Sequence, residues 1–212
     1  MNKSERKHFR QNQLIDSTID LILEKGLENT STIEINANAG LPNRTLHYYF
    51  ENKENLLDAT LRHLSRKINS YTVPRIRKSQ TTEEAIAVYI EGNFNDKIFQ
   101  DDMTVVWLTF WARARHSPIL QNSHDAMARR TLAGLARGLA KSLPKTRARE
   151  EALAFSVFVD GLWLRAAVDK GRWSAAEARR LCYQYVERQI GLKIGADIVA
   201  GVGSVLLSNQ AK

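Results

Sequence analysis

Apolar residues recur along the chain three and four positions apart, which is the spacing of helices that bury one face. The first such stripe runs from Leu14 to a helix-stop signal at Gly26, and no convincing run alternates polar and apolar residues as a strand would. Capping-box patterns and prolines divide the rest of the chain into similar segments. The expected helices cover about residues 14–25, 32–39, 41–49, 52–74, 81–90, 101–111, 117–142, 147–170 and 174–190. The sequence therefore predicts an all-α protein of about nine helices.

Two segments are less regular. Pro74 ends the fourth stripe, and it is expected to kink or end that helix because proline has no backbone N–H. The last stretch, from Gly191 to Leu207, is apolar but contains four glycines, and its pattern predicts no particular structure. The helical prediction therefore extends to about Ile190.

Composition is that of a globular and mostly helical protein. The chain has 212 residues, of which 43% are hydrophobic, and its 11 Gly and 4 Pro are few for a turn-dense sandwich or barrel. A single cysteine, Cys182, excludes an intramolecular disulfide and a multi-cysteine zinc site. No secretory signal is evident at the start, and the most apolar stretch, 152–168, is too short and too charged for a membrane span. We therefore expect a cytoplasmic protein with no membrane association.

The formal net charge of +8 is compatible with a polyanionic partner, but its position along the chain matters. Residues 1–70 carry ten basic and nine acidic side chains, residues 71–150 carry thirteen and eight, and residues 151–212 carry eight and six. Most of the positive excess therefore lies in the middle of the chain. Net charge alone does not locate a nucleic-acid-binding segment.

Two short predicted helices, 32–39 and 41–49, are separated by a turn at Gly40. This is the pattern of a helix-turn-helix, whose second helix lies in the major groove of DNA with its first residues on the base edges. Arginine can bind guanine, asparagine can bind adenine, and threonine can contact the thymine methyl group. The residues that we expect to face the bases are Asn43, Arg44, Thr45, His47 and Tyr48.

The residues around this pair have either a DNA-binding or a packing role. Thr32 and Lys53 stand at the starts of neighbouring helices, where a helix N-terminus attracts phosphate. Leu46 and Phe50 are expected in the core, and Tyr49 suits packing and binding equally. Four basic residues precede the first predicted helix, and they either lie along DNA or form a solubilising tail. They are Lys3, Arg6, Lys7 and Arg10.

The run 32–50, with the segment 52–57 after it, resembles the N-terminal domain of the TetR family of bacterial repressors. The resemblance covers residues 14–57, and many positions agree in order. The matching features are Ile35, the Ala39-Gly40 pair, the block Leu46-x-Tyr-x-Phe50, Lys53 and Leu56.

This resemblance implies a DNA-binding domain at residues 1–54 and a larger helical domain at residues 55–212. The larger domain would form a homodimer and hold a small inducer, and the fourth helix would be the lever between inducer and operator DNA. Arg44 stands where the family often has glycine, and Pro42 where it often has serine or threonine. This leaves open whether position 44 only clears space near the backbone or reaches the DNA.

The dimer is expected to form through the last two long helices, 151–167 and 175–190, as a four-helix bundle with the same helices of a second copy. A surface of this kind needs apolar side chains that its own protomer leaves uncovered. The residues that we expect to supply it are Leu153, Phe155, Val157, Leu162, Leu181, Tyr185 and Val186.

Aromatic residues cluster in the larger part of the chain. Ring faces together with one buried carboxylate are what a quaternary ammonium or polyamine ligand needs. The candidate ligand-binding residues are Tyr89, Trp107, Phe110, Trp111, Asp160 and Trp163. The alternative is that these aromatics belong to the core and that Asp160 pairs with Arg113 or Arg165.

Several blocks in this part resemble the BetI subfamily, the choline-responsive repressors of glycine betaine synthesis genes. They are Gly92-Asn-Phe94, Trp107-Leu-x-Phe-Trp-Ala112, His116-x-Pro118, Arg129-Arg-x-Leu132 and the run 160–167. The resemblance implies choline or betaine aldehyde as the inducer. The alternatives are another cationic or apolar inducer, and a repressor relieved by a partner protein.

An enzyme is the main hypothesis of another class. The sequence has no Gly-rich phosphate loop, no H-E-x-x-H and no G-x-S-x-G pattern, and its five histidines are scattered. His116, His124 and Asp125 lack the short ligand spacing of a zinc site and are expected at the surface. We expect no catalytic residue, no metal and no cofactor.

Overall fold

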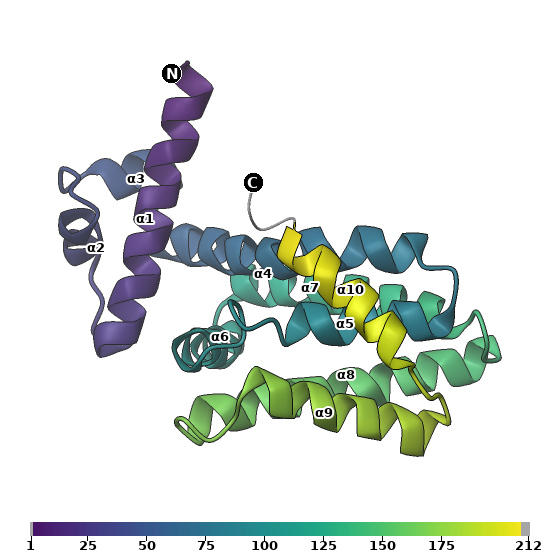
Figure 1. The fold of residues 1–212 in the computed structure, drawn as a ribbon. Helices are drawn as coiled ribbons and strands as arrows, with labels where there is room; N and C mark the ends of the chain where they lie inside the picture. The colour runs from purple at the N-terminus through teal and green to yellow at the C-terminus, as the bar shows by residue number, and fades with distance from the viewer. Residues whose placement is uncertain (1, 209–212) are drawn as a thin grey trace. The chain divides into compact units, whose positions relative to one another are not determined.

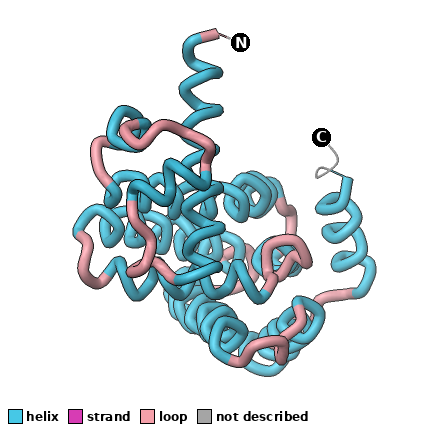
Figure 2. The backbone as a smooth tube through the Cα atoms, turned by 90° about the vertical axis from the view of Figure 1, so that its left-hand side faces the viewer, coloured by secondary structure: helices cyan, strands magenta, loops and turns pink. Residues whose placement is uncertain are grey.

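The computed structural model describes residues 2–208, except for the side chains of residues 71, 101 and 204–208. All described elements are helical, and no strand occurs among them (Figure 2). The elements are α1 (Lys3–Lys25), α2 (Thr32–Asn38), α3 (Thr45–Phe50), α4 (Lys53–Lys78), α5 (Thr82–Asn93), α6 (Asp101–Ala114), α7 (Pro118–Leu139), α8 (Lys145–Val168), α9 (Ala175–Tyr185), the π-helical turn η1 (Val186–Ile190) and α10 (Ala196–Ser208). The all-α prediction is confirmed, with ten α-helices in the described range.

Helix α1 begins eleven residues before the apolar stripe that predicted it. Asn2 caps it, because the Asn2 side chain accepts a hydrogen bond from the Glu5 N–H at 2.9 Å and the Glu5 carboxylate accepts one from the Asn2 N–H at 2.8 Å. The four basic residues near the N-terminus therefore lie on the first turns of a helix, and the interpretation as a tail is wrong. They are Lys3, Arg6, Lys7 and Arg10.

Three other boundaries differ from the sequence prediction. Helix α3 begins at Thr45, so residues 41–44 belong to the turn that precedes it. Helix α4 continues past Pro74 for a further turn. The carbonyl that loses its helical donor is that of Ser70, which is exposed, so water can satisfy it. The glycine-rich segment that the pattern did not place forms α10, which packs against α5.

The chain forms two compact units, one of residues 1–65 with 105–126, the other of residues 66–104 with 127–212. Helices α4, α6 and α7 each contribute to both. In the first unit, α1, α2 and α3 pack on one another (Figure 1). Their shared core consists of side chains with almost no exposed surface, among them Leu14, Ile22, Ile35 and Leu46. The expected domain boundary after residue 54 lies at the start of α4 and stays a prediction.

Helix α5 is the most buried element of the second unit, because every residue from Ala85 to Gly92 is buried. Aromatic rings join α8 to the end of α9: Tyr185 stacks on Phe158 at 4.6 Å and on Phe155 at 5.5 Å between ring centroids. These ring contacts pack one face of α8 against the end of α9 within the protomer.

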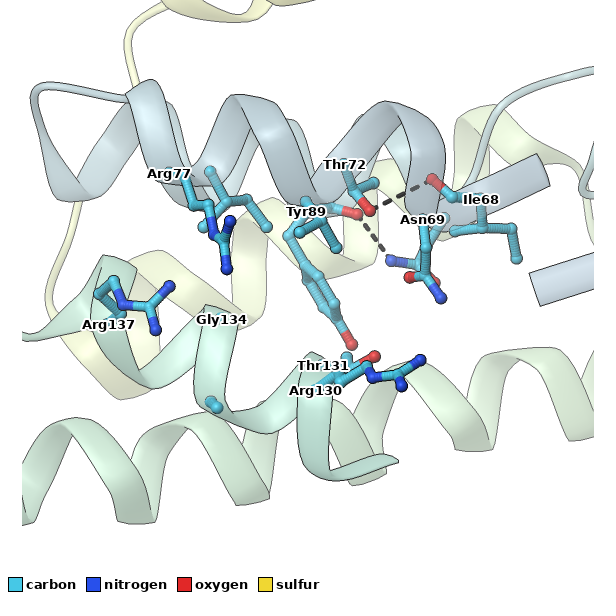
Figure 3. A pocket seen from close by; sticks show the side chains of 13 residues that line it. Ile68, Asn69, Thr72, Arg77, Tyr89, Arg130, Thr131, Gly134 and Arg137 are labelled. Atoms are coloured by element: carbon cyan, nitrogen blue, oxygen red, sulfur yellow. Dashed lines mark hydrogen bonds between the residues drawn. The ribbon is translucent and has the colours of Figure 1, made fainter. Parts of the chain in front are cut away.

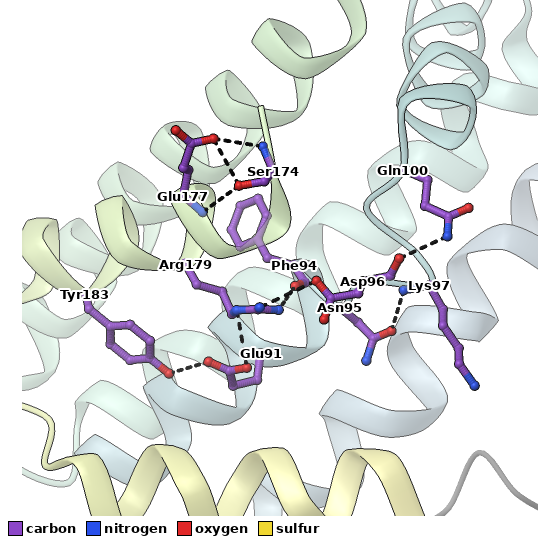
Figure 4. Close-up of polar contacts among 10 residues, drawn as sticks. All are labelled: Glu91, Phe94, Asn95, Asp96, Lys97, Gln100, Ser174, Glu177, Arg179 and Tyr183. Carbon is purple, nitrogen blue, oxygen red and sulfur yellow. Dashed lines mark hydrogen bonds and ion pairs between the residues drawn. The ribbon is translucent and has the colours of Figure 1, made fainter. Parts of the chain in front are cut away.

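A buried acid links α5 to α9 (Figure 4). The Tyr183 hydroxyl donates to Glu91 Oε1 at 2.8 Å, and Arg179 Nε lies 3.8 Å from Glu91 Oε2. Arg179 also donates to the backbone carbonyl of Phe94 at 2.6 Å. Burial raises the pKa of the Glu91 carboxyl, although the hydrogen bond and the guanidinium act in the opposite direction.

Candidate functional site

The turn between α2 and α3 depends on a left-handed glycine. Gly40 has φ +66°, a conformation that residues with a Cβ rarely adopt, and the Leu41 N–H after it donates to the Asn36 carbonyl at 2.8 Å. Residues 42–44 then lead into α3. The helix-turn-helix expected from the sequence is present, with Gly40 as its turn residue.

Asn36 holds the start of α3, and the sequence reading did not single it out. Its side chain has no exposed surface; the amide nitrogen donates to the carbonyls of Asn43 at 2.9 Å and Thr32 at 2.8 Å. The amide oxygen accepts from the Leu46 N–H at 3.0 Å. Arg44, at the N-cap position, makes no side-chain capping bond. Asn36 therefore supplies the cap of α3 from another helix.

The residues expected to face the bases are uncovered. Asn43, Arg44 and His47 are exposed, Thr45 is half-buried, and 79% of the Tyr48 surface is accessible. This contrasts with the buried Leu46 and Phe50 on the same short helix, whose core positions are confirmed. Tyr49 is half-buried and packs edge-on against Tyr48, with centroids 4.8 Å apart. Helix α3 thus presents a polar face that its own unit does not cover.

His47 has a second role at the end of α3. Its Nδ1 lies 2.8 Å from the Glu51 carbonyl oxygen, which can only accept, so Nδ1 carries the proton and Nε2 is the acceptor in the neutral ring. Glu51 has φ +61°, and its N–H donates to the His47 carbonyl at 3.1 Å. The ring therefore stabilises the strained end of α3 while its other nitrogen stays available to a ligand.

The two residues expected at phosphates have structural contacts of their own. Lys53 Nζ donates to the carbonyls of Leu27 at 3.2 Å and Thr30 at 2.5 Å, and burial lowers its pKa. It thereby fixes the loop between α1 and α2 and has one further N–H to offer. Thr32 is half-buried at the start of α2, where Ser31 and Glu34 form a capping box.

A groove lies beside the exposed tyrosine of α3 within the first unit. Its walls come from the first turns of α1 and from the end of α3, and three of its residues are cations. A wall of this composition suits the phosphate backbone of nucleic acid. The lining residues are Asn2, Lys3, Ser4, Arg6, Lys7, Tyr48 and Tyr49.

The expected ligand-binding aromatics do not form one described site. Trp107, Phe110 and Trp111 lie on α6 within the first unit, where the two tryptophan rings are 6.3 Å apart. In the second unit, Trp163 packs edge-on against Phe99 at 5.2 Å. Phe110 has no exposed surface, so it has the role of a core residue.

Asp160 is exposed, and the expectation of a buried carboxylate is wrong. Asp160 lies on α8 on the same side as the exposed Leu153 and Leu164. Its position in the helical repeat therefore places it at the surface and not in the core. Its charge is close enough to contribute to the raised pKa of Tyr89, after burial, which is the larger cause. The arginines suggested as its partners have others: Arg165 pairs with Asp169 at 2.9 Å, and Arg113 with Glu54 at 2.5 Å.

The second unit contains a cavity of about 300 Å³ between α4, α5 and α7 (Figure 3). Tyr89 lines it and is the single member of the expected ligand-binding set that does so. Three arginines line it as well, Arg77, Arg130 and Arg137, and the sequence reading did not select them. Arg77 is on α4 and the other two are on α7, so only the packing of these helices brings all three to one cavity.

The expected dimer surface is corrected on both long helices. Phe155, Leu162 and Val186 are buried in their own protomer and are unavailable to a partner. Leu153 and Val157 are exposed as expected, and two residues that the sequence reading omitted extend their stripe along α8. Those two are Leu164 and Val168. The four exposed residues are separated by four, seven and four positions, and this helical spacing is visible in the sequence.

Among the described residues, no group of three or more His, Cys, Asp or Glu side chains is arranged to hold a metal ion. None of the helices searched in the described range has the length and apolar character needed to cross a membrane.

Two protein families match the chain over most of its length. Residues 14–60 match the family described as bacterial regulatory proteins, tetR family. Residues 82–191 match the family described as BetI-type transcriptional repressor, C-terminal. The first match contains the helix-turn-helix, and the second contains α5 to η1.

Individual relatives agree with these families. The HTH-type transcriptional regulator BetI of Cronobacter sakazakii is 32% identical over 192 residues, which are 90% of this chain and 95% of the relative. The regulator of the same name from Burkholderia cenocepacia is 32% identical over 188 residues, which are 88% of this chain and 97% of the relative. These relatives are named transcriptional regulators, and the chain is a regulator and not an enzyme.

Solved structures share the fold at lower identity. A putative transcriptional regulator from Pseudomonas aeruginosa PAO1 has a TM-score of 0.75 at 18% identity, covering 88% of this chain and 91% of that one. A putative transcriptional regulator from Saccharomonospora viridis, in complex with choline, has a TM-score of 0.71 at 19% identity, covering 84% and 96%. The exposed polar face of α3, the glycine turn before it and the two family matches lead to one identity: the chain belongs to the TetR family of transcriptional regulators and is a repressor with a BetI-type C-terminal domain.

Proposed function

We propose that this repressor acts in the cytoplasm as a homodimer on double-stranded operator DNA and that a small molecule bound in its larger domain releases it. The observation that carries the DNA-binding part is the exposure of Asn43 and Arg44 in the turn and of His47 and Tyr48 on α3, beside the basic first turns of α1. The polar groups suit base edges in the major groove, and the cations suit phosphates.

The dimer is supported by an unpartnered stripe on α8. Leu153, Val157, Leu164 and Val168 are all exposed, and they are four and seven positions apart, so they share one face of the helix. Gly161 lies between them, and a Cβ there would meet nothing within 4 Å in the protomer. A second copy that covers this face with its own α8 would bury it symmetrically.

Release by an inducer requires a ligand that prefers the conformation unable to bind DNA. A ligand can shift this equilibrium by no more than its differential affinity for the two conformations. Helix α4 is the candidate lever, because its first residues belong to the unit of the helix-turn-helix and its last residues line the cavity of the other unit.

A quaternary ammonium inducer, choline or betaine aldehyde, is one candidate ligand. The names of the relatives and the choline bound by the Saccharomonospora viridis protein favour it. On this chain, Tyr89 and the nearby charge of Asp160 are the features that suit a cation, since an aromatic face attracts it and a carboxylate balances it. Calorimetry of the purified protein with choline and with betaine aldehyde tests this candidate directly.

The DNA-binding part is tested by selecting genomic fragments that the purified protein retains, followed by gel-shift titration at fixed salt. We expect Arg44→Ala to weaken binding to the selected fragment by about 1 to 3 kcal/mol if the guanidinium binds a base edge. Arg129→Ala, at an exposed position of α7, is the matched control and should leave affinity unchanged. Failure to retain any fragment would contradict the proposal.

A further inference from the structure

The cavity in the second unit is formed by one face from each of three helices. On α4 the lining residues include Ile68, Thr72 and Ile76, which are four positions apart and therefore lie in one row. On α7, Gly134 lies at the centre of the corresponding row. Helix α5 contributes Tyr89 between them (Figure 3). The cavity is thus part of the helical packing and not a gap between loops.

Two glycines of α7 explain why space opens here. A Cβ on Gly138 would lie 2.7 Å from the Ala85 side chain, so α7 and α5 are in close contact at this point. One turn earlier, a Cβ on Gly134 would meet nothing within 4 Å. Helices that touch at one turn and leave room at the next enclose a cavity. A larger side chain at position 134 would therefore occupy this space.

The charges that line the cavity all have the same sign. Arg77 of α4 and Arg130 and Arg137 of α7 line it, and no aspartate or glutamate does. Within the part of the chain that the structure describes, none of the three guanidinium groups forms a salt bridge with a carboxylate. All three residues are exposed, so their charged ends stand where the cavity meets solvent. A bound anion would balance this positive charge.

The inner wall combines apolar surface with neutral hydrogen-bonding groups. Ile68, Val73 and Ile76 supply the apolar part, and the Tyr89 phenol stands between the helices. Burial raises the pKa of Tyr89, and the Asp160 charge raises it further, so the hydroxyl keeps its proton and can donate. Tyr89 therefore adds a neutral donor without adding a negative charge to the cavity.

We propose that this cavity binds a small organic anion, with an oxyanion held by Arg77 and Arg137 and an apolar body held between α4, α5 and α7. This inference rests on the proposed function, because the bound anion would be the inducer that releases the repressor from DNA. Arginine matches carboxylate and phosphate oxygens with paired N–H donors. Choline and betaine aldehyde carry only positive charge and would be repelled by the same groups.

The size of the cavity limits the apolar body. A volume of about 300 Å³ is at the small end for ligand pockets and corresponds to about ten water-sized volumes. A straight alkyl chain of four to eight carbons with one oxyanion falls in this range. Titration with alkyl carboxylates and with alkyl phosphates distinguishes the two candidate oxyanions, carboxylate and phosphate monoester.

The first test compares charged and neutral ligands of the same shape. Isothermal titration calorimetry of the full-length protein would use alkyl carboxylates of four to eight carbons, the corresponding primary amides, the alkyl phosphates and choline. We expect at least one anion to bind about tenfold or more tightly than its amide, because charge-assisted hydrogen bonds are lost in the amide. If no carboxylate or phosphate binds more tightly than the amide of equal length, the proposal is wrong.

The second test places the anion in this cavity. Arg77→Gln and Arg137→Gln should each weaken binding of the best anion about tenfold, whereas Arg129→Gln should not, because Arg129 is an exposed residue of α7 that does not line the cavity. Gly134→Leu should abolish binding by filling the space, with Gly134→Ala as the control of smaller volume. Equal affinities for the Arg77, Arg129 and Arg137 variants would overturn the assignment.

The outcomes separate this proposal from the function on which it rests. Calorimetry measures binding to the protein alone, and a gel shift with the selected operator fragment measures release. If an anion binds but does not release the protein from DNA, the anion site is supported and its role as the inducer site is refuted. If choline releases the protein from the operator and no anion binds, the proposed repressor function is supported and the anion site is refuted.

Discussion

The side-chain oxygen of Asn36 accepts a hydrogen bond from the backbone N–H of Leu46 at 3.0 Å, across the turn of the helix-turn-helix. The same amide donates to the Asn43 carbonyl at 2.9 Å. One buried side chain on α2 thus fixes the position at which α3 begins. Arg44 precedes α3 and makes no capping bond, so its side chain is available to DNA.

We predict that Asn36→Leu destabilises the protein by about 1 to 3 kcal/mol, because leucine fills the volume but leaves the buried N–H of Leu46 and the carbonyl of Asn43 without their partner. Operator affinity should fall with it, since the start of α3 is no longer held. Urea denaturation and gel-shift titration measure the two effects. Asn38→Leu is the control: the Asn38 amide is exposed and donates only one bond, to Ser17 at 3.1 Å. Equal losses for the two variants would contradict the capping role.

The helix-turn-helix was predictable from sequence because its signals are local. Gly40 in the turn and the buried Leu46 and Phe50 occupy positions that short-range patterns define. The role of Asn36 was not predictable in this way, because an asparagine in a short helix usually faces solvent. Only the fold shows that its amide lies against the next helix.

Lys53 is predicted to have a structural role in addition to any contact with DNA. Lys53→Met keeps most of the side-chain stem and removes the bonds to the carbonyls of Leu27 and Thr30, so the free energy of unfolding should fall by about 1 to 3 kcal/mol. Unchanged stability would contradict this. The salt dependence of operator binding decides the second role: a slope reduced by about one, relative to wild type, would indicate that the ammonium also binds a phosphate.

The start of α2 should become less stable in acid. Glu34 pairs with Lys25 and accepts two bonds from Ser31, and these contacts lower the pKa of its carboxyl to about 2, with the bond from Lys25 as the largest cause. The folded pKa is below the unfolded value, so the stabilisation is present above about pH 4.5 and is lost as pH falls towards 2. Denaturation of wild type and Glu34→Gln across this range tests it. The two should converge in stability at the acid end, and a constant difference would refute the prediction.

Glu91 is predicted to give a pH dependence of the opposite sign. Burial raises the pKa of its carboxyl above the ordinary 4.5, so the folded state favours the protonated acid, and this stabilisation is present below about pH 4.5 and lost as pH rises through the raised pKa. Glu91→Gln keeps an acceptor for the Tyr183 hydroxyl and cannot ionise. The stability of wild type relative to this variant should therefore decrease between about pH 4 and neutrality. A relative stability that rises with pH would show that the pairing with Arg179 outweighs burial.

The ligand site was less predictable than the DNA-binding surface for a physical reason. Periodicity identified Trp107, Phe110 and Trp111 as one helical face, but it cannot distinguish a ligand-binding face from a core face, and Phe110 is fully buried. The cavity arginines come from helices far apart in the sequence; Arg77 and Arg137 face one space only after α4 and α7 have packed. Long-range packing of this kind leaves no local pattern.

The exposed apolar stripe of α8 is predicted to form the dimer interface. If Leu164 lies at the centre of a symmetric dimer, Leu164→Glu places two carboxylates in a buried interface, one from each copy, and weakens dimerisation by about 3 kcal/mol or more. Ile119→Glu is the matched control, because Ile119 is exposed to nearly the same degree, 40% against 43%, on a different helix. Sedimentation should show the Leu164 variant as a folded monomer and the Ile119 variant with the mass of the wild type. A dimeric Leu164 variant would exclude this face of α8 as the interface, and a wild-type monomer would refute the dimer itself.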